Sequence, residues 1–223
     1  KFQGNNYFIA LGYKSNDKHD FQFTFTGAPQ WHHQRSFANT ITDYLKYGSN
    51  GEPNIKYNSD WGYKNGEEFS WARNYYHKPV MSLNWDYKIN DKMKLSSVVY
   101  ASWGRGGGTG NIGKSPFSYK TANGLVPFDE FVKFNTGQPN SIGTPLAPST
   151  APGHVGEYVT NSTTGFTRRA SVNSHDWYGA VVNLNTQLTK NLILDFGVDA
   201  RTYVGYHFRN INDRLGADVY FDN

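Results

Sequence analysis

The sequence contains no cysteine and no apolar run of the roughly 18 residues that a membrane-spanning helix requires. The first absence excludes disulfide bonds and thiolate metal sites, and the second excludes a transmembrane helix. Hydrophobic residues make up only 37% of the 223 residues, which is low for a soluble domain of this length. The net charge is +4, and the lysines and arginines are scattered along the chain. Because they form no basic stripe, we expect no nucleic-acid partner.

Aromatic residues and glycine are the abundant types. The sequence has 16 tyrosines, 15 phenylalanines and 23 glycines, and aromatic residues account for 17% of the chain. A polar composition with many aromatic residues suits strands that are apolar on one face and polar on the other, with rings at the membrane boundaries. The composition therefore favours a membrane β-barrel over a soluble domain with an aliphatic core.

Three polar turn signals, around residues 14–18, 89–92 and 189–191, are each flanked by segments in which apolar and polar residues alternate. Alternation with period two on both sides of a short turn is typical of a β-hairpin. Charges at every second position of such a strand cannot all lie in a dry core, but they can face water. The predicted hairpins span about residues 5–27, 76–105 and 174–207.

The connections between these hairpins are long. Residues 28–75 and 106–173 show no sustained period and are rich in Gly, Pro, Asn, Ser and Thr. Compact soluble domains rarely hold structureless loops above about 15 residues, whereas outer-membrane barrels combine short periplasmic turns with long extracellular loops. A soluble β-sandwich or propeller is the structural alternative, and it explains the alternation but not this asymmetry.

We therefore predict an all-β fold in which residues 1–223 form part of one antiparallel transmembrane β-barrel domain. About six strands are predicted, and strands of about ten residues are long enough to cross a bilayer when tilted. Outer-membrane barrels start at about eight strands, so the complete barrel must be larger than this chain.

The clearest alternation follows residue 191. We predict that its apolar side chains face lipid, because a basic residue on the lipid face at mid-bilayer costs roughly 2–4 kcal/mol. The predicted lipid-facing set is Leu192, Leu194, Phe196 and Val198. The predicted lumen-facing set is Asp195, Asp199 and Arg201.

Gly108–Ser115 fits the phosphate-binding loop pattern G-x-x-x-x-G-K-[ST] position by position. A working loop of this kind needs a helix that begins at its lysine, so that backbone N–H groups meet the phosphates. Pro116 follows directly, and residues 117–124 show no helical period. We predict that the segment is a glycine-rich surface loop that binds no nucleotide. Since no nucleophile stands in sequence with a base and an orienting group, we predict no catalytic residues, no enzyme activity and no cofactor.

The best candidates for ligand binding lie in the predicted loops. Tryptophan and arginine dominate binding hot spots, and loops held by a rigid scaffold often carry function. Adjacent histidines point apart on a strand, so the pair at 32 and 33 does not by itself predict a metal site. The structural alternative is a loop that packs against a plug or neighbouring loops. The candidates are Trp31, His32, His33, Arg35 and Arg105.

Five segments, in order along nearly the whole chain, carry a family resemblance. They are Gly27–Arg35, Asn74–Pro79, Gly104–Gly110, Gly197–His207 and Leu215–Tyr220. These segments resemble the barrel of Bacteroidetes-type TonB-dependent outer-membrane receptors, whose members carry a carboxypeptidase-regulatory-like domain. Ala217 departs from the pattern, where a second glycine is expected, and this departure puts no function in doubt.

The resemblance implies TonB-dependent active transport of a nutrient across the cell outer membrane, through a barrel of about 22 strands. The nutrient classes are a chelated metal, a vitamin, a glycan or a peptide. The expected partners are the rest of the barrel, its plug, the periplasmic TonB system, outer-membrane lipid and a surface lipoprotein. Because the resemblance covers the barrel alone, we expect the plug and the N-terminal domain to be absent from this segment. The alternatives are a passive porin-like channel and a soluble β-rich carbohydrate-binding module.

Overall fold

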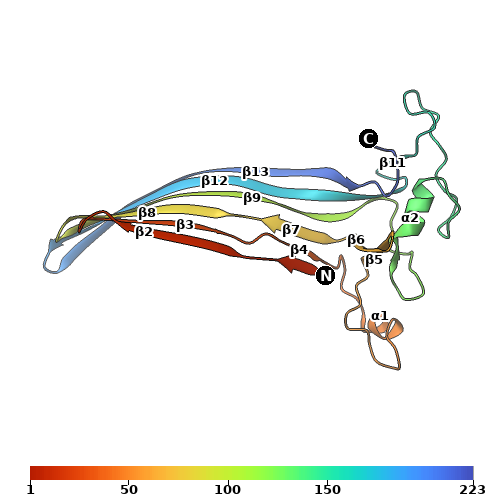
Figure 1. Ribbon diagram of the computed structural model, residues 1–223, viewed down its shortest axis with the longest axis horizontal. Coiled ribbons are helices and arrows are strands. Elements are labelled where there is room, and N and C mark those ends of the chain that lie inside the picture. The colour runs from red at the N-terminus through yellow and green to blue at the C-terminus, as the bar shows by residue number, and fades with distance from the viewer. Residues whose placement is uncertain (223) are drawn as a thin grey trace.

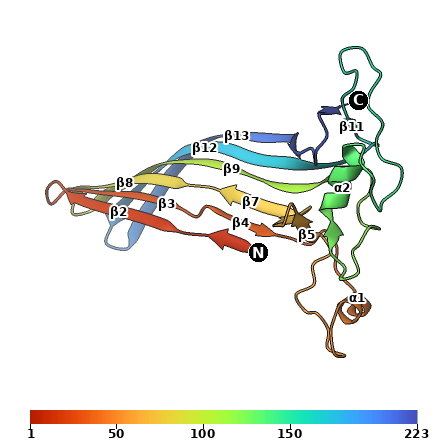
Figure 2. The same ribbon diagram turned by 45° about the vertical axis from the view of Figure 1, so that its right-hand side comes forward.

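The chain folds mainly as one long antiparallel sheet. A computed structural model describes residues 1–222, with 56% of the chain in strands and 6% in helices, which confirms the all-β prediction. Figure 1 shows the long strands side by side, with the short turns at one end and the irregular segments and both helices at the other. Figure 2, turned by 45°, shows the same separation. The nine strands of the main sheet are β1 (Phe2–Gly4), β2 (Tyr7–Lys14), β3 (His19–Gly27), β4 (Gln30–His33), β7 (Arg73–His77), β8 (Val80–Asn90), β9 (Met93–Gly113), β12 (Phe166–Thr189) and β13 (Leu192–Asp213).

Three hairpins lie next to one another in this sheet. β2 pairs with β3, β8 with β9, and β12 with β13, and each hairpin turns at one of the polar signals in the sequence. β3 also pairs with β8, and β9 with β12, so the order of the long strands across the sheet follows the chain. This arrangement places every short turn at the same end.

Six lines of strand run side by side across the sheet, and three of them consist of two strands separated by a break. The three breaks lie at the same level. Asn5 and Asn6 separate β1 from β2, Pro29 lies between β3 and β4, and Pro79 lies between β7 and β8. Proline has no N–H to donate to a ladder, so it favours a break in pairing. We call the end of the sheet away from the short turns its outer end. Beyond the breaks, β1, β4 and β7 continue the sheet toward this end, and β7 pairs with the outer part of β9.

The segments predicted as loops are more ordered than expected. β9 runs to Gly113 and β12 begins at Phe166, so the strands extend well past the predicted limits of residues 105 and 174. Strand β4 also lies within the predicted loop 28–75, and β7 begins within it. The prediction missed these strands because glycines interrupt the alternation of polar and apolar residues in the outer half of β9.

The remainder of the predicted loops folds, together with residues 214–222, into a small unit that we call the cap, made of residues 34–72, 114–165 and 214–222. It holds β5 (Trp61–Lys64), β6 (Glu67–Ser70) and β10 (Val126–Pro127), which form one small sheet. It also holds β11 (Val159–Asn161), paired in parallel with β14 (Val219–Phe221). The two helices are α1 (Ile41–Lys46) and α2 (Phe128–Asn135). Neither of these helices, among the residues described, is long and apolar enough to cross a membrane.

The cap has a dry aromatic core. In α2, Phe128, Phe131 and Phe134 recur every three residues and are buried, while Asp129 lies in the first turn, where the helix dipole favours a negative charge. The full core cluster is Trp71, Val126, Phe128, Phe131, Phe134, Phe166 and Leu215. Because Phe166 opens β12 and Leu215 follows β13, this core joins the cap to the outer end of the sheet.

Two buried polar side chains fix the cap in place. The Asn135 amide donates to the carbonyl oxygens of Phe166 at 2.6 Å and Leu215 at 3.1 Å, and accepts from the Phe166 N–H at 3.0 Å. Arg168 donates to the Ser70 carbonyl oxygen at 2.8 Å, and its guanidinium lies 3.8 Å from the ring centroid of Phe69. Burial lowers the pKa of Arg168 to about 10.

Candidate functional site

The register of the main sheet sorts its side chains onto two faces. Phe23 of β3 is opposed by Leu11 of β2 and by Leu83 of β8. Leu83 is opposed by Val99 of β9, and Val99 by Ala180 of β12. Directly opposed residues point to the same side of a sheet. This apolar face carries the odd-numbered residues of β1 to β4 and β7 to β9 and the even-numbered residues of β12 and β13, and the polar face carries the others.

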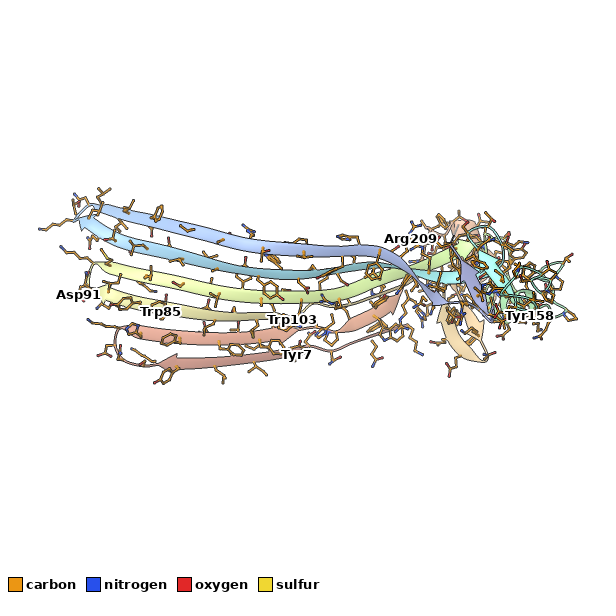
Figure 3. The ribbon with its side chains drawn as sticks, turned by 90° about the horizontal axis from the view of Figure 1, so that it is seen from above. Tyr7, Trp85, Asp91, Trp103, Tyr158 and Arg209 are labelled. Carbon is orange, nitrogen blue, oxygen red and sulfur yellow. The ribbon has the colours of Figure 1, made fainter. Side chains whose placement is uncertain are left out.

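The apolar face is bounded by two rows of aromatic side chains. Near the short turns, the His19 ring stacks on Tyr87 with centroids 4.5 Å apart, and Phe21 stacks on Trp85 at 6.2 Å. The second row contains Tyr7, Trp103 and Tyr206. Figure 3 shows Trp85 near the turn at Asp91 and shows Trp103 and Tyr7 together farther along the sheet.

The distance between these rows matches a membrane. On β9, eight residue steps separate Leu95 from Trp103, which is about 26 Å at roughly 3.3 Å per residue. The apolar band of outer-membrane barrels is about 25 Å tall. Between the rows, within the described strands, the apolar face carries no Asp, Glu, Lys or Arg.

No other element of the described chain covers the apolar face. Leu11 is 64% exposed and Val99 is 52% exposed, although both lie in the middle of the band. Soluble monomers rarely expose contiguous apolar patches larger than a few hundred Å², and this face extends across six strands. An apolar patch of this extent marks a candidate interaction surface.

The opposite face is hydrophilic and internally bonded. Asn185 donates to the Asp195 carboxylate at 2.7 Å, and Arg201 pairs with Asp199 at 2.7 Å. Asp195, Asp199 and Arg201, the three residues predicted to face the lumen, all lie on this face. The register places the predicted lipid-facing residues Leu192, Leu194, Phe196 and Val198 on the apolar face. The identity of the two environments, lipid and lumen, stays a prediction.

The polar face also holds an aromatic cluster that the sequence did not indicate. The Tyr100 ring packs edge-on against Trp177 at 5.7 Å, and Trp177 contacts Tyr203. Gly179 leaves the room for Tyr100, since a Cβ there would lie 2.3 Å from the Tyr100 hydroxyl oxygen. Trp177 lies 77 positions after Tyr100 and 26 positions before Tyr203, and only the register brings the three together.

Three of the predicted binding residues belong to a strand rather than a loop. Trp31, His32 and His33 lie in β4, which pairs with β1 and β7. Trp31 and His33 lie on one side of the sheet and His32 on the other, so the two histidines cannot share a ligand. The guanidinium of Arg73 lies 4.0 Å from the Trp31 ring centroid, and Trp31 Nε1 donates to Gln3 Oε1 at 3.2 Å.

The other two predicted residues lie apart from each other. Arg35 follows β4 and donates to the Tyr44 hydroxyl in the cap. Arg105 lies on β9 and pairs with Asp176 at 2.8 Å, next to the second aromatic row. Arg105 and Trp31 both line a groove of about 450 Å³ at the level of the strand breaks, on the apolar side of the sheet. The five predicted residues therefore do not converge on one site.

The glycine-rich segment is a strand and not the predicted surface loop. Residues 108–113 belong to β9 and pair with β12, and the Lys114 N–H donates to the Gly165 carbonyl oxygen at 2.8 Å. The next helix begins only at Phe128, so no helix N-terminus meets Lys114. On the polar face, Gly110 lies opposite Arg169 of β12, and a Cβ there would lie 3.3 Å from the guanidinium. The glycines make room for side chains of the neighbouring strand.

The main sheet has one apolar and one polar face, and the cap packs at its outer end. No protein-family model matches the chain, and neither a curated protein nor a solved structure matches it. The family suggested by the resemblance of short segments therefore stays an expectation. The functional conclusion depends on the two faces of the sheet.

Proposed function

We propose that this chain is part of the wall of an outer-membrane β-barrel that takes up a nutrient in a TonB-dependent manner. The observation that carries the proposal is the exposed apolar face, about one bilayer core in height and bounded by an aromatic row on each side. Lipid chains cover this face, and tyrosine and tryptophan lie at the two interfaces, where an amphipathic ring is most stable.

The unpaired edges of the sheet support a larger barrel. Among the described strands, β13 pairs only with β12, so its other edge leaves the backbone of 22 residues without strand partners. In a bilayer each unsatisfied backbone group costs several kcal/mol, so a spanning sheet must close on itself. Further strands of the barrel therefore lie beside β13 and beside β2.

The asymmetry of the ends supports an orientation. Outer-membrane barrels have short periplasmic turns and long extracellular segments. The three hairpin turns then face the periplasm, and the cap lies outside the cell. Under this orientation the polar face, with Asp195, Asp199 and Arg201, lines the lumen and meets the plug. The cap is the part of the chain that first meets cargo or a surface lipoprotein.

Spin labelling tests the membrane assignment. Because the sequence contains no cysteine, a spin label attached to one introduced cysteine reports on that position of the chain alone. We choose the neighbouring positions Asp195→Cys and Phe196→Cys. In the membrane-embedded receptor, spin relaxation of a label at 196 should be accelerated by oxygen, which concentrates in lipid. A label at 195 should relax with a water-soluble nickel complex. Two labels that are equally accessible from water would instead support a soluble β-rich binding module.

The coupling to energy is tested separately. Uptake of the cargo is measured in cells with and without TonB, with barrel assembly checked in both. We expect uptake to require TonB, because the resemblance is to TonB-dependent receptors. Uptake that continues undiminished without TonB would identify a passive porin-like channel built from the same wall.

A further inference from the structure

Two arginines meet on the polar face where the sheet joins the cap. Arg169 of β12 is opposed by Ile211 of β13, and Arg209 is opposed by Ser171, so the two arginines are diagonal neighbours on one face. Such neighbours lie within reach of each other when their side chains are long. Figure 3 shows Arg209 at the junction of sheet and cap, beyond the row that contains Trp103.

The charges of this pair are not neutralised within residues 1–222. Neither arginine takes part in an ion pair there, and Arg169 donates to the Ser171 hydroxyl at 2.5 Å. Burial lowers the pKa of Arg169, and the nearby charge of Arg209 lowers it further. Arg201 lies on the same face, nearer the short turns. Its charge is neutralised by an ion pair with Asp199.

The pair borders a cavity of about 290 Å³. Its walls include Ile112, Ile211, Tyr220 and Asp222 besides the two arginines. The Tyr220 hydroxyl is buried and has no hydrogen-bond partner within residues 1–222, so a further polar group is left in the wall. Asp222 is exposed and is the one carboxylate among the described residues that line the cavity.

We propose that this cavity binds a small oxyanion, a carboxylate or a phosphate, through the guanidinium groups of Arg169 and Arg209. A guanidinium presents parallel N–H donors that match the two oxygens of a carboxylate or phosphate. Like charges side by side are unfavourable, and a bound anion relieves their repulsion. Gly110 contributes by leaving space for the Arg169 side chain.

The position of the cavity suggests its role. Its assignment to cargo rests on the proposed function, since the polar face lines a lumen only if the sheet is a barrel wall. Under that proposal the cavity lies at the outer mouth and holds the anionic group of a cargo molecule on its way in. Anion binding itself does not depend on transport.

Calorimetric titration of the complete receptor in detergent, at low salt, tests the inference. The probes are citrate and inorganic phosphate, which distinguish a carboxylate ligand from a phosphate ligand. We expect saturable binding of at least one probe, weakened about tenfold or more by Arg169→Gln and by Arg209→Gln, because each removes a charge-assisted contact. Arg201→Gln, on the same face but outside the cavity, is the matched control and should bind as the wild type does.

Circular dichroism shows whether each variant keeps its strands. A folded wild-type chain that binds neither probe overturns the inference, as does undiminished binding by the folded double variant. If the arginine variants fail to fold, Gly110→Val, which crowds the Arg169 guanidinium without removing charge, provides the second test. Its binding should also be weakened, and undiminished binding by this folded variant would count against the site. If no anion binds but the spin labels at 195 and 196 behave as expected, the membrane assignment still holds. If an anion binds but the spin labels do not behave as expected, the anion site still holds.

Discussion

His33 shows how burial sets the behaviour of one side chain at the outer end of the sheet. Its ring lies 5.4 Å from that of Trp31, and its Nδ1 is buried without a hydrogen-bond partner among the described residues. Burial is the main cause that lowers the pKa of His33 to about 4, the charges of Arg73 and Lys1 act in the same direction, and Glu68 opposes them. The protonated ring is therefore disfavoured in the folded chain.

This shift predicts a loss of stability in acid. Between the unfolded value of 6.5 and the folded value of about 4, the unfolded chain binds more protons, so the free energy of unfolding falls as the pH falls through this window. For the wild type we expect the free energy of unfolding to fall by on the order of 1 kcal/mol across this window, since solvent screens part of the effect. His33→Gln should abolish this fall. The measurement is the Tm of wild type and variant between pH 7 and pH 4.5.

His32 offers the matched control for this experiment. It is adjacent in sequence and lies on the other side of β4. His32→Gln should keep the acid sensitivity of the wild type. Equal slopes of Tm against pH for wild type and His33→Gln would show that another group controls the acid response.

Among the strands, glycine has two different roles. At Gly179 of β12 the missing side chain accommodates Tyr100 of β9, as Gly27 accommodates Tyr7 on the other face. Packing an aromatic ring over a glycine pins the register of two strands. At Gly12 of β2, by contrast, a Cβ would meet no atom within 4 Å.

Substituting alanine at these two glycines should have opposite results. Gly179→Ala places a Cβ 2.3 Å from the Tyr100 hydroxyl oxygen and should lower the free energy of unfolding by about 1–3 kcal/mol, as overpacking does. Gly12→Ala should be neutral or stabilise by up to about 1 kcal/mol, because it restricts only the unfolded chain. Urea unfolding in detergent measures both. A destabilised Gly12→Ala together with a neutral Gly179→Ala would contradict the packing described for Tyr100.

The whole molecule has two parts that are stabilised differently. The sheet depends on backbone pairing and, under the proposed function, on lipid around its apolar face. The cap depends on its own aromatic core, in which Trp71 from the first connection packs 5.7 Å from Phe131 of the second. The two long connections therefore fold as one unit, and deleting either one should disrupt the other.

This division predicts selective loss of the cap. Phe131 is fully buried, and Phe131→Ala should destabilise the cap by about 3–5 kcal/mol through lost contacts and a cavity. We expect limited proteolysis to cut this variant within residues 34–72 and 114–165 while the long strands β2, β3, β8, β9, β12 and β13 stay protected. Val155→Ala, at a position 73% exposed, should leave the cleavage pattern unchanged. Cleavage within β9 or β12 at the same rate would show that sheet and cap unfold together.

The sequence by itself determined the parts of the fold that depend on neighbours along the chain. Alternation with period two around three short turns specifies the hairpins and the face on which Phe196 and Asp195 point, because a strand reverses its side chains at every residue. That pattern fails where glycines replace the side chains of one face. The sequence therefore predicts a loop where the outer half of β9 lies, and it predicts no cap core. Helix α2 has only eight residues, which is too short for a clear helical period in the sequence.

Only the tertiary structure decided which distant residues meet. Trp31 and Arg105 share a groove, but His32 lies on the far side of β4, because strand pairing fixes the side on which each residue points. Arg169 and Arg209 are 40 positions apart, with a turn and two long strand segments between them, and only the register of β12 on β13 makes them neighbours. A shift of one residue in that register would place the two arginines on opposite faces. Local periodicity cannot specify such a pairing, since it is set by the summed contacts along both strands.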